Sequence, residues 1–136
     1  MKVKDISEIR CPKCGGKVSF TMWNFLDSDL NIEETYALTS GSFFRHICPD
    51  CGAGINVYHS VSFNDPRSRS FIKYIQTDQS DEEKQALVRV LSDVVKEDGI
   101  PGYSFKVVFD PKDFIESVRH VRFTPPAASY QPYRAS

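Results

Sequence analysis

The sequence contains no run of apolar residues long enough to cross a membrane, which takes roughly 18 in succession. Residues 1–10 alternate charged and apolar side chains and lack the apolar core of a secretory signal, so we expect a cytoplasmic protein. Neither sign of charge dominates, because 17 Lys and Arg stand against 18 Asp and Glu, a formal net charge of -1. Such a chain has no general attraction for nucleic acids or anionic lipids.

The length and composition are those of one ordinary globular domain. The chain has 136 residues, of which 40% are hydrophobic and 26% charged. That length suits one core better than two. We predict a single domain over residues 1–123 and a flexible, proline-containing tail over 124–136.

The most informative feature is a five-residue pattern, Cys-Pro-X-Cys-Gly, which occurs at residues 11–15 and again at 48–52. Two cysteines separated by two residues can direct both sulfurs at one tetrahedral ion. The glycine can adopt a positive φ that turns backbone N–H groups toward the thiolates. In a reducing compartment such cysteines are metal ligands rather than disulfides. The predicted metal ligands are Cys11, Cys14, Cys48 and Cys51.

The pattern favours zinc as the bound metal, with iron as the alternative. Tetrahedral four-thiolate sites suit both metals, and rubredoxin-type iron sites also use two such cysteine pairs. Four protein ligands leave no coordination position for water, which is typical of structural rather than catalytic zinc. Metal binding should therefore be coupled to local folding, and metal catalysis is not expected.

Together with the acidic stretch between them, the two C-P-x-C motifs resemble the bacterial and archaeal CpXC domain family. Residues 103–116 (YSFKVVFDPKDFIE) are similar to the C-terminal strand-and-helix region of that family, so the resemblance spans residues 9–122. The family is functionally uncharacterised. The resemblance implies a metal-binding domain with the four cysteines as ligands, and it implies no reaction or partner.

Hydrophobic periodicity predicts an α+β fold, in which an antiparallel sheet with a zinc-ribbon-like four-cysteine end is packed by two helices. The predicted strands cover Lys17–Trp23, 42–47, 54–63, 69–76 and 103–109, and the predicted helices cover Asp81–Asp98 and 111–121. Residues 24–41 are polar and acidic, and we expect an irregular connection there.

The predicted helix Asp81–Asp98 has clear end signals. Ser80 and Glu83 match a capping box, and Gly99 is placed to end the helix in a left-handed conformation. One apolar stripe is formed by Leu87, Val90, Leu91, Val94 and Val95. We expect this stripe to cover the sheet, so that Leu87→Ala combined with Leu91→Ala unfolds much of the population, and a fragment ending at Gln76 does not fold.

The second predicted helix begins with Asp110 as its N-cap and Pro111 as its first residue. Phe114, Val118 and Val121 recur at helical spacing and should form its buried stripe.

No catalytic constellation is recognisable, so we do not expect an enzyme. His46 is surplus to a complete four-cysteine shell and should be a surface strand residue. His59 and Asp65 lack a nucleophile at recognisable spacing. His120 shares its helix with basic residues and should lie on a solvated face.

These observations favour a binding or interaction module with an unidentified protein partner, in which zinc is a structural clip. The alternative is a nucleic-acid-binding zinc ribbon, in which Lys13 and Lys17 contact phosphates and Phe20 and Trp23 offer stacking surfaces. A rubredoxin-like iron electron carrier is a further, less favoured alternative. The sequence does not indicate an oligomeric state.

Overall fold

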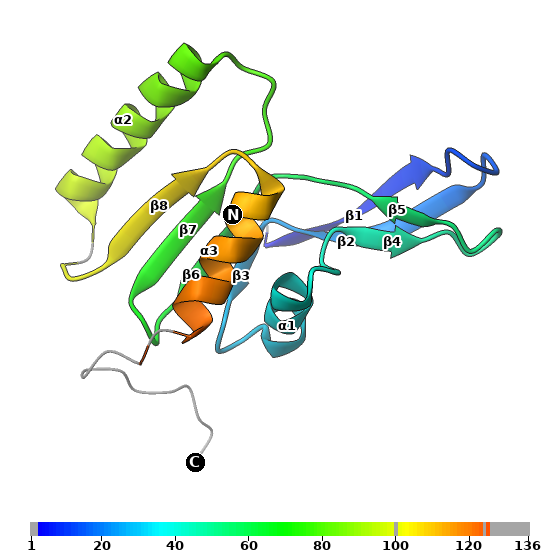
Figure 1. Ribbon diagram of the computed structural model, residues 1–136, viewed down its shortest axis with the longest axis horizontal. Coiled ribbons are helices and arrows are strands. Elements are labelled where there is room, and N and C mark those ends of the chain that lie inside the picture. Colours follow the sequence, from blue (N-terminus) through cyan, green and yellow to red (C-terminus); the bar gives the residue numbers. More distant parts are fainter. Residues whose placement is uncertain (1–2, 100, 124, 126–136) are drawn as a thin grey trace.

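The computed structural model describes residues 3–99, 101–123 and 125 (Figure 1). Apart from Pro125, the predicted tail over 124–136 lies outside the described residues. The elements follow one another as β1 (Lys4–Arg10), β2 (Lys17–Trp23), β3 (Phe25–Asp27), α1 (Ile32–Ser40), β4 (Arg45–Ile47), β5 (Gly54–Asn56), β6 (Val61–Asp65), β7 (Ser70–Tyr74), α2 (Asp81–Asp98), β8 (Ser104–Val108) and α3 (Pro111–Phe123).

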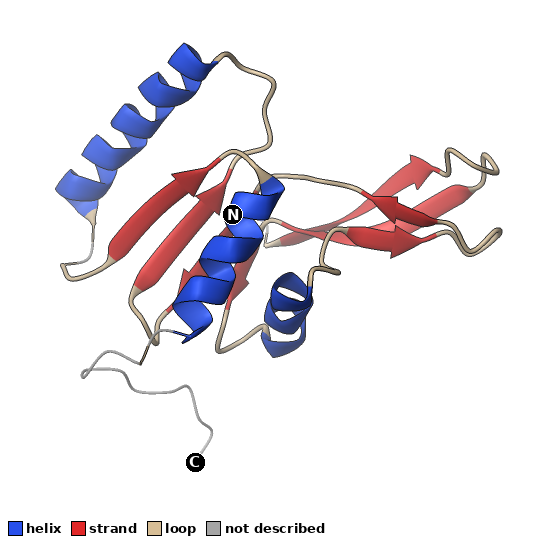
Figure 2. Ribbon diagram, in the orientation of Figure 1, coloured by secondary structure: helices blue, strands red, loops and turns tan. Residues whose placement is uncertain are grey.

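The described strands form three sheets, and Figure 2 shows the strands in red. Strands β1 and β2 make one antiparallel hairpin, and β4 and β5 make another. The largest sheet has the order β3-β6-β7-β8 and is mixed, because β6 and β7 pair antiparallel while β3 and β8 join their neighbours in parallel. The α+β class and the ribbon-like cysteine end are thus confirmed, with the strands divided among three sheets.

The main core lies between the four-stranded sheet and α3, which crosses one face of that sheet (Figure 1). Strands β6 and β7 alternate strictly between buried and half-buried residues, as strands with one covered face do. Phe114 and Val118 of α3 are fully buried, and Val121 packs against the same core. The carboxylate of Asp110 accepts a hydrogen bond from the Lys112 N–H at 2.8 Å. The buried stripe predicted for this helix is therefore confirmed.

The irregular connection expected over residues 24–41 is wrong, because this stretch contains β3 and α1. Helix α1 is only weakly amphipathic, and Thr35 and Leu38 are its buried residues, so its sequence carries little helical periodicity. It ends at Gly41, whose φ of 87° lets its N–H reach carbonyls of the last turn.

Helix α2 has the predicted bounds and the predicted capping box of Ser80 and Glu83. Its packing, however, differs from the expectation. None of its described residues is buried, and Val90 and Val94 are 59% and 49% exposed. The helix lies beside the edge strand β8 and stands away from the main core (Figure 2). The prediction that α2 covers the sheet core is therefore wrong, because α3 occupies the buried face instead.

Three smaller expectations are also corrected. Gly99 has a φ of -74° and is extended, not left-handed. The strand expected at 42–47 is limited to β4. The strand expected at 54–63 is divided into β5 and β6, because the chain leaves the small hairpin there and joins the four-stranded sheet. Among the described residues, no helix combines the length and the apolarity that crossing a membrane requires.

Candidate metal centre

The two cysteine motifs fold into the same local structure. In the first, the carbonyl of Cys11 accepts a hydrogen bond from the Gly15 N–H at 2.8 Å, and in the second Cys48 accepts one from Gly52 at 2.9 Å. Both glycines have a φ of 74°, a conformation that other residues adopt only with strain. The repeated Cys-Pro-X-Cys-Gly sequence therefore specifies two equivalent knuckles, as predicted.

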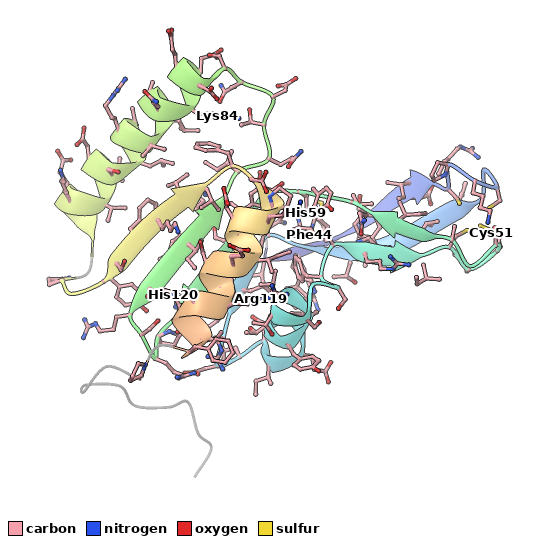
Figure 3. The ribbon with its side chains drawn as sticks, viewed as in Figure 1. Phe44, Cys51, His59, Lys84, Arg119 and His120 are labelled. Carbon is pink, nitrogen blue, oxygen red and sulfur yellow. The ribbon has the colours of Figure 1, made fainter. Side chains whose placement is uncertain are left out.

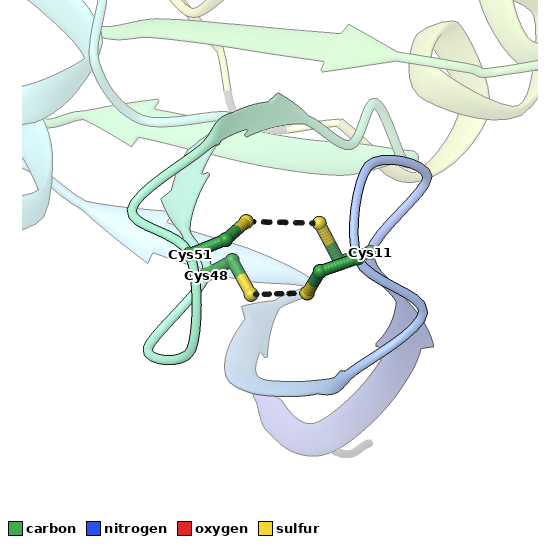
Figure 4. Close-up of side chains that lie close together, drawn as sticks. Cys11, Cys48 and Cys51 are labelled. Carbon is green, nitrogen blue, oxygen red and sulfur yellow. Dashed lines mark hydrogen bonds between the residues drawn. The ribbon is translucent and has the colours of Figure 1, made fainter.

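The knuckles bring the four sulfurs together (Figure 4). All four Sγ atoms lie within 4.8 Å of one another, and the pairs Cys11–Cys51 and Cys14–Cys48 are each 3.6 Å apart. A tetrahedral site with metal–sulfur bonds of about 2.3 Å has edges of about 3.8 Å. The cysteines are not disulfide-bonded. Donor type, number and spacing thus fit a metal ion held by four thiolates.

Burial alternates within the cluster. The first cysteine of each knuckle is buried, with Cys11 2% and Cys48 1% exposed, while Cys14 and Cys51 are exposed. The only aliphatic residue buried with them in this cluster of described residues is Val18 of β2. The part of the molecule formed by the two hairpins β1–β2 and β4–β5 with their knuckles, here called the ribbon end, therefore has a very small apolar core. Two of the four candidate ligands belong to this core.

Backbone N–H groups are directed at two of the sulfurs. The Lys13 N–H lies 3.4 Å from Cys11 Sγ, and the Gly16 N–H lies 3.4 Å from Cys14 Sγ. The N–H of Cys14 is the main cause that lowers the pKa of Cys11 to about 7, and the Lys13 N–H adds to it. Such donors stabilise a thiolate and moderate its charge when it binds a metal.

Crowding of the sulfurs has the opposite effect on the exposed cysteines. The Gly16 N–H favours the Cys14 thiolate, but the Cys48 sulfur and burial outweigh it and raise the pKa of Cys14 to about 12. In the same way the Ala53 N–H favours the Cys51 thiolate, while burial and the Cys11 sulfur raise the pKa of Cys51 overall. Four thiolates at this spacing need a cation among them, since each disfavours the ionisation of its neighbours.

A protein-family model described as CpXC protein matches residues 9–124 of this sequence. The chain belongs to the CpXC family. The match confirms the resemblance drawn from the cysteine motifs and covers most of the chain, from the end of β1 to the end of α3. The family is of uncharacterised function. A search of curated proteins found no match, and a search of solved structures found none either.

The CpXC domain places Lys13 and Lys17 at the ribbon end, where both side chains are exposed. Lys17 Nζ lies 4.0 Å from the Glu8 carboxylate across the β1–β2 hairpin, so its charge is partly offset. Phe20, expected as a stacking surface for bases, is already stacked on His46 with ring centroids 4.0 Å apart. The structure therefore brings the two lysines near the knuckles, but the face of Phe20 that stacks on His46 is not open to a base.

The histidines of the CpXC domain are not part of the cysteine cluster. His46 is half-buried against Phe20 rather than at the surface, and burial lowers its pKa. His59 lies beside Phe44 at the junction of the ribbon end and the main core (Figure 3), and burial lowers its pKa as well. The His120 side chain is exposed, as expected.

The burial and the binding partners of Asp65 could not be foreseen from the sequence. Its carboxylate is fully buried and accepts hydrogen bonds from the hydroxyls of Ser28 at 2.5 Å and Ser68 at 2.6 Å. It also forms an ion pair with Arg122 at 3.0 Å, which ties the end of β6 to α3. No sequence signal could have shown this, because Asp65 and Arg122 are 57 residues apart. Asp65 is therefore engaged in hydrogen bonds and an ion pair within the core, and it does not pair with His59 as a catalytic acid or base.

Proposed function

We propose that this CpXC domain is a non-catalytic interaction module whose four cysteines hold one structural zinc ion. The observation that carries the proposal is the convergence of four sulfurs from two equivalent knuckles within 4.8 Å. A shell of four protein ligands is closed to water and substrate, which is the arrangement of structural rather than catalytic zinc sites.

The position of the ligands in the chain supports a structural role. Cys11 and Cys14 lie between β1 and β2, whereas Cys48 and Cys51 lie between β4 and β5. One ion bound by all four joins the ends of two hairpins that have little apolar core of their own. Metal binding then supplies free energy that the apolar contacts of this end lack, and folding of the ribbon end depends on it.

Zinc is the metal we favour, and the cytoplasm is the compartment in which the thiols stay reduced. Two CxxC knuckles followed by short antiparallel strands are typical of zinc ribbons. Iron suits the same ligands and would make the protein a coloured, redox-active carrier. A colourless protein with one zinc per chain supports the zinc proposal, and a protein that is red when oxidised and contains iron contradicts it.

A protein partner agrees best with the surface of the ribbon end. Ile6 and Ile47 are 77% and 56% exposed on β1 and β4, and they are the apolar side chains that a protein partner would cover at this end. The nucleic-acid alternative depends on Lys13 and Lys17, and the proximity of Lys17 to Glu8 counts against it.

The direct test compares Cys14→Ser and Cys51→Ser with His46→Ala, a matched control that removes a nearby metal-binding side chain from outside the cluster. Each purified variant is assayed for bound zinc by elemental analysis and for thermal unfolding by circular dichroism. We expect both serine variants to lose most of the zinc and to melt at lower temperature, and the alanine variant to keep its zinc. Full zinc in the serine variants, or loss of zinc from His46→Ala, would show that the assigned ligands are wrong.

A further inference from the structure

A groove between α1 and the end of α3 combines features of a built binding site. It has a volume of about 230 Å³, and none of the four cysteines lines it. Helix α1 packs against α3 here, as Figure 1 shows, and Arg119 Nε donates a hydrogen bond to the Thr39 carbonyl at 2.7 Å. The groove is lined by Ser28, Ile32, Thr35, Tyr36, Thr39, Arg122 and Phe123.

The rim of the groove is apolar and exposed. Ile32, Tyr36 and Phe123 are 70%, 73% and 86% exposed, and the neighbouring Leu30 is 63% exposed. Large apolar side chains gathered around a groove, rather than scattered singly, mark a surface that is covered by another group.

The floor of the groove contains one buried hydroxyl that needs a partner. Thr35 is 4% exposed, and among the described residues its Oγ1 has no hydrogen-bond partner. The neighbouring polar groups are already engaged, because the Ser28 hydroxyl and Arg122 Nη1 both donate to Asp65. The charges of Asp65 and Arg122 balance each other. The site therefore calls for an uncharged group with an apolar body and a single hydroxyl at its tip, which describes the side chain of tyrosine.

We propose that the groove between α1 and α3 binds a tyrosine side chain from residues 126–136 of the same chain. The described structure reaches Phe123, whose own side chain lines the groove, so the following residues start at the site. Tyr130 and Tyr133 follow within ten residues. Seven residues can span up to roughly 24 Å when extended, which is ample to return a side chain to a groove beside Phe123.

Tethering and charge both favour this occupant. A segment attached next to its site has an effective concentration in the millimolar range, so a weak contact is enough to fill the groove. Pro125, Pro126 and Pro132 lower the conformational entropy that docking removes. Arg134 is the only charged side chain of residues 126–136, and the first turn of α1 carries the acids Glu33 and Glu34. A partner that uses this groove must displace the segment.

The test uses the full, zinc-loaded chain and NMR spectroscopy. We expect nuclear Overhauser effects between the Thr35 methyl group and the ring protons of one tyrosine of residues 126–136. Replacing that tyrosine, as Tyr130→Ser or Tyr133→Ser, should remove these effects, shift the Ile32 methyl signals and increase the fast backbone motion of the segment. Tyrosine variants that leave the Thr35 and Ile32 signals unchanged would overturn the proposal.

The hydroxyl contact is tested separately. Thr35→Val keeps the shape of the side chain, and we expect it to lower the docking equilibrium constant about threefold to tenfold, as loss of one hydrogen bond does. Thr21→Val is the matched control, since Thr21 is exposed on β2 and does not line the groove. It should leave docking unchanged. Equal docking in wild type and Thr35→Val would contradict the proposal, and docking that weakens on tenfold dilution would show a second copy as the occupant.

Discussion

Truncation of Phe114 tests whether α3, rather than α2, closes the core. Phe114 is fully buried, and its ring centroid lies 5.5 Å from that of Tyr74 and 6.5 Å from that of Phe44. Replacing such a residue by alanine removes its burial and leaves a cavity, at a cost of about 3–5 kcal/mol. A domain of this size holds only about 5–15 kcal/mol of stability, so Phe114→Ala should be marginally folded.

The comparison is with two alanine variants in α2. Val94 is 49% exposed, so Val94→Ala should change the free energy of unfolding by less than about 0.5 kcal/mol. Leu91 is half-buried, and Leu91→Ala should cost about 1 kcal/mol, well below the value for Phe114→Ala. These values replace the expectation from sequence that substitutions at Leu87 and Leu91 unfold the protein.

The assay is urea unfolding followed by far-ultraviolet circular dichroism and by the fluorescence of Trp23, the single tryptophan. Excess zinc is kept in every sample, so that a difference in metal occupancy does not appear as a difference in stability. Equal slopes of free energy against urea would show that the compared states are alike. If Leu91→Ala or Val94→Ala destabilised the protein as much as Phe114→Ala, the described packing of α2 would be refuted.

Three further predictions follow from individual side chains. Burial, with a contribution from the charge of Asp110, raises the pKa of Tyr74 to about 12. The neutral phenol is therefore favoured in the fold, and the stability that it contributes is lost as pH rises from about 10 to 12. Absorbance near 295 nm should show a last tyrosine ionisation step that Tyr74→Phe removes, and a step near pH 10 for every tyrosine would contradict this prediction. Arg122→Met should cost about 3–5 kcal/mol because it leaves the Asp65 carboxylate buried without its counter-charge, and a cost below about 1 kcal/mol in urea unfolding would show that the pair is not needed. Oligonucleotide titrations near physiological salt should show weak binding only, and submicromolar binding that Lys13→Glu and Lys17→Glu abolish would favour the nucleic-acid alternative.

The candidate metal centre could be predicted almost completely from the sequence, because each knuckle is a local structure. Proline, glycine and the two-residue spacing determine where the sulfurs of Cys11 and Cys14 point, and the motif at 48–52 positions the sulfurs of Cys48 and Cys51 in the same way. What the sequence did not reveal is the difference in burial between the two cysteines of each knuckle. That difference depends on Val18 and on the way in which two hairpins from separate parts of the chain meet.

Helices and strands could be predicted where local sequence signals are strong. They were missed or misplaced where contacts between distant parts of the chain determine the structure. The bounds of α2 follow from its capping box and the strand Lys17–Trp23 from its alternation, and both match the structure. Helix α1 was missed because its stability depends on packing against α3 rather than on its own periodicity. Periodicity also showed which residues of α2 share a stripe, but it could not show that α3 covers the core instead.

X-ray absorption spectroscopy of the purified protein tests the central proposal most directly, because it reports the metal, the ligand atoms and their distances together. Our account predicts one zinc per chain, surrounded by four sulfur atoms at about 2.3 Å and by no nitrogen or oxygen. An iron edge, a shell with nitrogen or oxygen ligands, or a protein purified anaerobically that contains no metal and binds no added zinc would contradict it.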